Sequence, residues 1–120
     1  NIGVKIMSKK LLGHVGVDSG QLMVTDPCYV RQFLNNEYTT HDSKEIDSSY
    51  SYNGSCNQTC KTENQGGELG NGLGLSFSTG FGDGHYPVYA YYEDVNGWGR
   101  RIKKIEIEFF TDEDLEEDDE

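Results

Sequence analysis

Two alternating segments in the second half of the chain constrain the fold most strongly. They are "YPVYAYYED" (residues 86–94) and "RIKKIEIEF" (residues 101–109), and "NGWG" lies between them. Successive side chains of a strand point to opposite faces of a sheet, so each segment reads as a strand with two different faces. Asn-Gly between alternating segments is a strong hairpin signal. The sequence therefore predicts a β-hairpin here, with Ile105 and Ile107 on the face opposite Lys104 and Glu106.

Earlier segments predict further strands. "LGLSFSTG" (residues 73–80) alternates apolar and small residues, and "SSYSYNGSC" (residues 48–56) is read as one strand within a long excursion over residues 39–72. Residues 13–18 and 21–26 flank Ser19-Gly20, which predicts a hairpin. Pro27 ends the second of these strands, and Val30, Phe33 and Leu34 have helical spacing.

These elements predict a mainly β protein, all-β or α+β. We expect an antiparallel sheet in a small barrel or a two-sheet sandwich, with one short helix after Pro27. A chain of 120 residues is the size of one domain. We assign residues 1–10 to an N-terminal extension or cloning remnant with a possible first strand, residues 11–110 to a single β-rich domain, and residues 111–120 to a disordered acidic tail.

The charge is concentrated at one end. The net charge is −11, but eight of the nine residues in "DEDLEEDDE" (112–120) are acidic, which leaves 13 acidic and 10 basic residues elsewhere. Such a block is typical of a solubilising tail, a contact for a basic partner or a mimic of nucleic-acid phosphate. The acidic body disfavours direct nucleic-acid binding. Apolar runs are too short to span a bilayer, and three cysteines without a signal peptide favour a cytoplasmic location.

Polar residues at predicted strand ends are the candidates for chemistry. The glycines of "STGFGDGHYPVY" (78–89) allow main-chain N–H groups to approach an anion, although the spacing matches neither a Walker nor a Rossmann motif. The alternative is a plain connection in which Asp83 bonds its own turn. If the carboxylates converge with the histidine, they would suit a metal-dependent hydrolase; these candidates are Asp18, Asp26, Asp83 and His85.

The cysteines and tyrosines leave alternatives open. Cys56 and Cys60 have a spacing that zinc sites permit, and Cys28 and His41 would complete four ligands. A disulfide between Cys56 and Cys60 or between Cys28 and Cys56, or simply free thiols, are the other readings. The tyrosines of the second half either pack in the core or form a contact surface.

Three ordered motifs, "VDSGQLMVTDPCY", "YSYNGSC" and "STGFGDGHYPVY", followed by "RIKKIEIEF", resemble a family of small uncharacterised bacterial and phage proteins. The resemblance covers residues 15–109, and members of that family carry the label of domains of unknown function. Cys60 departs from the pattern, which argues against a zinc site. The motif positions in this chain are Asp18, Ser19, Gly20, Gln21, Asp26, Pro27, Cys28, Tyr29, Cys56, Gly82, Asp83, Gly84, Tyr86 and Pro87.

Together these features favour a non-catalytic binding module of phage or bacterial cytoplasm, for a small-molecule ligand or a host protein. The alternatives are the metal-dependent hydrolase and a structural protein that assembles with itself as a homo-oligomer. No cofactor is predicted, and a divalent metal enters only with the hydrolase. The predicted ligand-binding residues are Asp18, Ser19, Gln21, Asp26, Tyr29, Gly82, Asp83, Gly84 and Tyr86.

Overall fold

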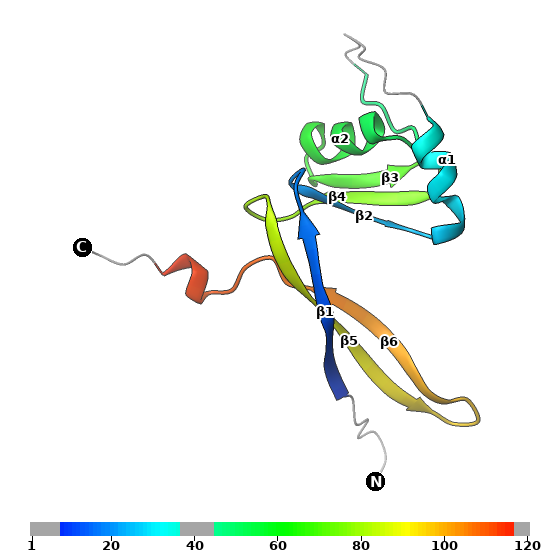
Figure 1. Ribbon diagram of the computed structural model, residues 1–120, viewed down its shortest axis with the longest axis vertical. Coiled ribbons are helices and arrows are strands. Elements are labelled where there is room, and N and C mark those ends of the chain that lie inside the picture. Colours follow the sequence, from blue (N-terminus) through cyan, green and yellow to red (C-terminus); the bar gives the residue numbers. More distant parts are fainter. Residues whose placement is uncertain (1–7, 37–44, 117–120) are drawn as a thin grey trace. The chain divides into compact units, whose positions relative to one another are not determined.

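The structure is a computed structural model that describes residues 8–36 and 45–116. The chain forms two compact units, one made of residues 17–83 and the other of residues 1–16 and 84–120. Each unit contains one three-stranded sheet, with strand orders β1-β5-β6 and β2-β4-β3 (Figure 1). The prediction of a mainly β fold with antiparallel sheets is confirmed.

The β1-β5-β6 sheet contains the predicted hairpin. Strands β5 (Gly84–Val95) and β6 (Gly99–Ile107) pair antiparallel, and β1 (Ser8–Val17) lies on the other side of β5. The amide of Trp98 donates to the carbonyl of Val95 at 2.8 Å, and Gly97 and Gly99 have φ of 83° and 81°, a region that favours glycine. The sequence "NGWG" therefore forms the expected turn.

The register of β5 and β6 confirms the predicted division into two faces. Val88 and Ala90 pair with Ile107 and Ile105, whereas Tyr89 and Tyr91 pair with Glu106 and Lys104. Paired residues point to the same side of a sheet. One face of this hairpin is therefore apolar and the other combines tyrosines with charged side chains.

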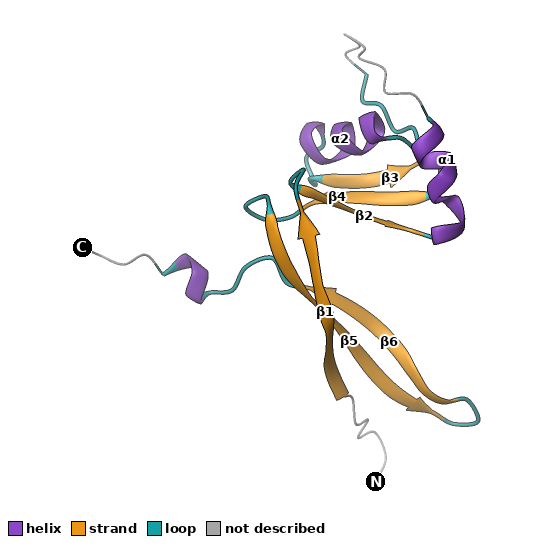
Figure 2. Cartoon of the chain, viewed as in Figure 1, coloured by secondary structure: helices purple, strands orange, loops and turns teal. Residues whose placement is uncertain are grey.

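The second unit places helices beside a short sheet. It contains β2 (Gln21–Thr25), β3 (Gly66–Leu69) and β4 (Gly74–Ser78), the 3₁₀ turn η1 (Pro27–Tyr29), and the helices α1 (Val30–Asn35) and α2 (Tyr52–Lys61). Figure 2 shows α2 lying along β3 and β4, which it contacts. The short helix after Pro27 is confirmed as α1. Another 3₁₀ turn, η2 (Glu113–Leu115), lies in the acidic segment.

The predicted strand over residues 48–56 is wrong, because residues 52–61 form α2. Ser51 caps this helix, since its hydroxyl accepts from the amide of Gly54 at 3.0 Å. The buried side of α2 is polar and includes Ser55 and Thr59, so the segment lacks the apolar periodicity by which an amphipathic helix is recognised.

The predicted hairpin over residues 13–26 is also wrong. β1 pairs in one sheet and β2 in the other, where β2 lies beside β4 in the register Gln21 to Ser78 and Thr25 to Gly74. Gly20 does adopt a positive φ of 69°, as a turn glycine can. Residues 18–20 thus connect a strand of one sheet to a strand of the other. β2 forms its backbone hydrogen bonds with β4 rather than with β1.

Tyr50 organises the interior of the second unit. It is buried, its ring meets that of Phe33 edge-on at 5.2 Å, and its hydroxyl lies 2.6 Å from the hydroxyl of Thr25. Thr25 in turn donates to the carbonyl of Leu73 at 2.8 Å. These contacts fix α1 and the loop before α2 against the end of the sheet. Neither described α-helix is long and apolar enough to cross a membrane.

Candidate functional site

The structure brings two of the predicted motifs together. The amide of Gly20 donates to Oδ1 of Asp83 at 2.9 Å, and the amide of Thr79 donates to the carbonyl of Gly20 at 3.2 Å. Gly82 has φ of 117° and accepts, through its carbonyl, from the Thr79 hydroxyl at 2.7 Å. The Asp83 carboxylate therefore joins two loops 63 residues apart, a role that fits the turn-stabilising alternative.

Asp26 lies at the opposite end of β2 from this junction. Five strand residues separate the two ends, about 17 Å at roughly 3.3 Å per residue. Oδ1 of Asp26 accepts from the amide of Cys28 at 3.0 Å, and the hydrogen bonds from Cys28 lower the pKa of Asp26. The same carboxylate raises the pKa of Cys28, which makes the reactive thiolate form of this exposed side chain less favourable.

Gln21 forms hydrogen bonds within the second unit, to residues of α2. Its Oε1 accepts from the hydroxyls of Ser55 at 2.7 Å and Thr59 at 3.1 Å, and its Nε2 donates to the sulfur of Cys56 at 3.4 Å. Ser55 also bonds the buried Ser76 at 2.7 Å. Gln21 thus connects α2 to the sheet, and this network accounts for the polar underside of the helix.

The remaining predicted residues are divided between the units. Asp18 and Ser19 lie in the bend before β2, and Tyr29 ends η1. Gly84, His85 and Tyr86 start β5, in the other unit. Tyr86 is buried and its ring meets that of Phe109 edge-on at 5.2 Å, so it is a packing residue there.

The candidate metal ligands are dispersed among the described elements. Cys28 lies in η1, Cys56 and Cys60 lie in α2, and all three are free thiols, while His41 lies outside the described residues. Within residues 8–36 and 45–116, no three His, Cys, Asp or Glu side chains gather closely enough to hold a metal ion. The hydrolase candidates Asp18, Asp26, Asp83 and His85 accordingly do not form one described cluster.

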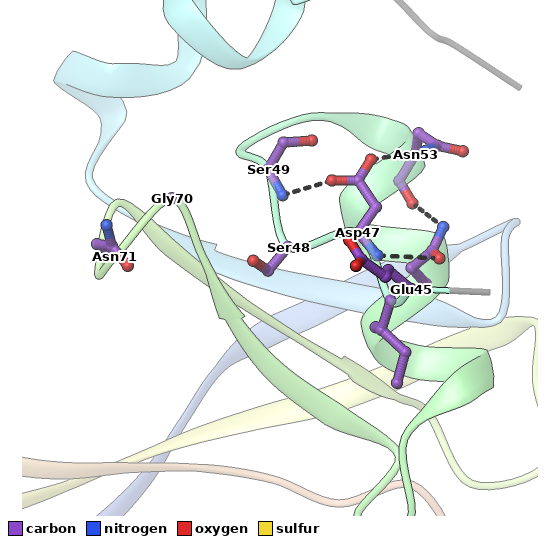
Figure 3. Close-up of a pocket in the computed structure, with 9 residues that line it drawn as sticks. Glu45, Asp47, Ser48, Ser49, Asn53, Gly70 and Asn71 are labelled. Carbon is purple, nitrogen blue, oxygen red and sulfur yellow. Dashed lines mark hydrogen bonds between the residues drawn. The ribbon is translucent and has the colours of Figure 1, made fainter. Parts of the chain in front are cut away.

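A polar hollow of about 510 Å³ lies beside the start of α2 (Figure 3). Asp47 organises it: its carboxylate accepts from the Ser49 amide at 2.8 Å and from the Asn53 side chain at 2.7 Å. The Asp47 amide donates to Oδ1 of Asn57 at 3.2 Å, and the Asn57 amide group donates to the carbonyl of Asn53 at 2.8 Å. These polar groups bond one another, so we assign them to shaping the loop and capping the helix.

The outward face of the β2-β4-β3 sheet is apolar. We call it the open face; it carries Leu22, Val24, Leu75 and Phe77, since Leu22 pairs with Phe77 and Val24 with Leu75. Val24 is 60% exposed and Leu75 is 42% exposed, whereas Ser76, between Leu75 and Phe77, is fully buried on the α2 side. The α2 side of the sheet combines the buried polar Ser76 with the fully buried Leu69, so some aliphatic side chains lie under the helix while Val24 and Leu75 face outward.

A hollow of about 300 Å³ continues from the open face. It is lined in part by Val24, Leu75 and the predicted site residues Asp26 and Tyr29, and also by Glu68, which pairs with Leu75. Asp26 is held ionised by its lowered pKa, so an apolar surface here adjoins a fixed negative charge. Sequence reasoning named Asp26 and Tyr29 as candidates and did not identify the open face. One signal was available in the sequence. In "LGLSFS" small residues alternate with apolar ones, and a helix with a polar buried side packs on the small residues and leaves the apolar ones exposed.

Residues 7–97 match a family described as "Protein of unknown function (DUF4241)". This match covers both motifs at the Gly20–Asp83 junction and every strand of the open face. No curated protein and no solved structure matches the chain.

Proposed function

We propose that this chain, which belongs to the family of proteins of unknown function DUF4241, is a non-catalytic binding module that docks a protein partner on the open face. The observation that carries the proposal is the exposure of Val24 and Leu75 as a cross-strand pair. An exposed apolar surface with a charged border is typical of an interaction site. The interface beneath α2 supports the same reading, because hydroxyl groups of Ser55 and Thr59 bond Gln21 there. Val24 and Leu75 lie on the opposite side of the sheet.

Burial of the exposed pair on this face would contribute measurably to affinity. Complete burial of one aliphatic side chain contributes roughly 2 kcal/mol. The exposed fractions of 60% for Val24 and 42% for Leu75 therefore correspond to about 2 kcal/mol on docking. That value is equivalent to a factor of about 30 in affinity. Two residues thus make a small hot spot, and the rest of the face excludes water around them.

The charges around the face indicate the chemistry of the partner. Asp26 and Glu68 line the hollow, and residues 17–83 contain nine acidic and three basic residues. A partner that presents an apolar strand or helix flanked by Lys or Arg would complement this surface. A protein fits better than a small molecule, because small ligands bind in enclosed clefts that bury most of their surface.

Photo-crosslinking in cells tests this function, because the crosslinker captures the protein that lies against the open face. A benzoylphenylalanine at position 75 would be compared with the same group at Lys61, an exposed position on α2 in the same unit. We expect a discrete crosslinked protein from position 75 that position 61 does not give. Asp substituted for Val24 should abolish the crosslink. The same products from both positions, or none from position 75, would contradict the proposal.

A further inference from the structure

The β1-β5-β6 sheet is locally cationic in an acidic chain. Six of the ten Lys and Arg residues lie in β1 and β6. Four of them reach the face of the sheet that carries Tyr89 and Tyr91, which we call the cationic face. They are Lys9, Arg101, Lys103 and Lys104.

The register and the contacts place each cation on this face. Lys104 pairs directly with Tyr91, and Arg101 pairs with Glu93, two residues further along β5. Lys103 is the extra residue at the irregularity between these pairs, and its Nζ lies 3.2 Å from Oε1 of Glu93. A bulge of this kind adds one side chain to a strand face and so raises the local density of charge.

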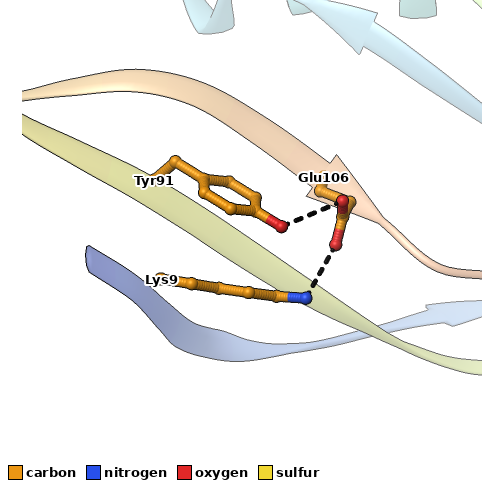
Figure 4. A network of polar contacts seen from close by, with 3 residues as sticks. All are labelled: Lys9, Tyr91 and Glu106. Carbon is orange, nitrogen blue, oxygen red and sulfur yellow. Dashed lines mark hydrogen bonds and ion pairs between the residues drawn. The ribbon is translucent and has the colours of Figure 1, made fainter. Parts of the chain in front are cut away.

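The tyrosines hold two of the cations in fixed positions. Nζ of Lys9 lies 4.2 Å from the ring centre of Tyr89, and Nζ of Lys104 lies 4.4 Å from that of Tyr91. The Tyr91 hydroxyl donates to Glu106 at 3.1 Å, and the same carboxylate pairs with Lys9 at 3.0 Å (Figure 4). Ordering long side chains before binding lowers the entropic cost of recognition.

Two carboxylates, Glu93 and Glu106, contact these cations, and Glu108 follows on the same side where its amide donates to the Pro87 carbonyl. Four cations against three carboxylates leave the face with a positive excess. The tyrosine rings already carry ammonium groups, which leaves them poorly placed to stack on nucleic-acid bases. The face therefore fits carboxylates better than it fits single-stranded nucleic acid.

We propose that the cationic face binds the acidic segment of the same chain, residues 112–120. Eight of these nine residues are acidic, and those that the structure describes, 112–116, are exposed. Both the segment and the β6 cations lie beyond residue 97, where the family match ends. The segment is therefore favoured as the ligand of the cationic face, because its charge is opposite and because both features lie in the part of the chain outside the family match.

The segment is long enough to reach the face within one chain. From Ile107, where β6 ends, to Glu120 there are 13 residue steps, about 43 Å when extended at roughly 3.3 Å per residue. Arg101 lies six residues back along β6, about 20 Å at the same rise. A tether of this length gives an effective concentration on the order of millimolar. At micromolar protein the segment of the same chain therefore outcompetes that of a second copy.

The test uses a fluorescein-labelled peptide with the sequence of residues 111–120, titrated by anisotropy at low salt. The chain ending at Thr111 should bind this peptide at least tenfold more tightly than the full chain, in which the segment occupies the face. Raising the salt should weaken binding, because exposed charges are screened. In the shortened chain, Lys103→Glu with Lys104→Glu should weaken binding at least tenfold. The matched control, Arg31→Glu with Lys61→Glu, changes the same charge in the other unit and should have little effect.

Lys104 also contacts Tyr91, so Lys103→Glu alone serves as a second variant, and circular dichroism checks that each variant folds. Equal peptide binding by the full and shortened chains would overturn the proposal. A dimer that forms with rising concentration and is lost on shortening would also overturn it, since the segment would then bind a second copy. Tighter binding of a 20-nucleotide single-stranded DNA than of the peptide would assign the face to nucleic acid instead.

Discussion

Replacing Gly54 by alanine tests how closely α2 is seated. Alanine in a helix interior normally stabilises by about 1 kcal/mol relative to glycine. Here the new Cβ would lie 1.9 Å from the carbonyl oxygen of Ser49. That loop is anchored at its backbone, because the Ser48 carbonyl accepts from Gly70 at 2.8 Å and the Ser49 amide donates to Asp47 at 2.8 Å. Overpacking costs about 1–3 kcal/mol, and an anchored backbone calls for the upper end of that range. We therefore expect Gly54→Ala to destabilise the protein by about 2 kcal/mol net.

The measurement is the free energy of unfolding in urea, followed by circular dichroism and extrapolated to water. Gly67→Ala is the matched control, since its Cβ would meet only the side chain of Gln58, whose oxygen lies at 2.1 Å. This side chain can rotate away at the cost of its hydrogen bond to Asp47, about 1 kcal/mol. Gly54→Ala should therefore be the more damaging of the two. If it were as stable as the wild type, or more stable, the described seating of α2 would be refuted.

Two further predictions concern titrating groups. The hydrogen bond from Lys9 lowers the pKa of Glu106 below its ordinary 4.5, so its stabilising contribution is complete above pH 4.5 and is lost as the pH falls through the lowered value. Urea unfolding between about pH 2 and 6 should show a smaller acid loss in Glu106→Gln than in the wild type; identical profiles would exclude the pair. Because Asp26 raises the pKa of Cys28, Asp26→Asn should speed alkylation of Cys28 by iodoacetamide near pH 8, with exposed Cys60 as the internal reference. Mass spectrometry of the modified peptides gives both rates, and an unchanged ratio would contradict the assigned hydrogen bond.

Elements with strong local signals could be predicted from the sequence. The alternation in β5 and β6, the turn at Gly97 and the strand end before Pro27 follow from side-chain periodicity and backbone restriction. α2 could not be predicted in this way, because its buried positions hold Ser55 and Thr59, whose hydrogen bonds to Gln21 form only in the folded protein.

Part of the candidate site also has a local signal in the sequence, and part depends on tertiary packing. Asp26 and Tyr29 stand out as polar and aromatic residues at a strand end, and the structure places both at one hollow. The open face depends on which side of the sheet α2 covers, and strand alternation alone does not contain that information. The wrong hairpin has a similar cause, because β2 selects β4 as its neighbour over a sequence distance of about 50 residues.

Calorimetric titration of the protein captured at position 75 tests whether the open face is a docking surface. Val24→Asn with Leu75→Asn should weaken binding about 30-fold, the equivalent of about 2 kcal/mol. It should also make the heat-capacity change less negative, the marker of lost apolar burial. Ile102→Asn with Ile105→Asn is the matched control, since these isoleucines are 53% and 50% exposed on the other sheet and should leave affinity unchanged. Full affinity in the Val24 and Leu75 variant, or equal losses in both variants, would contradict the account.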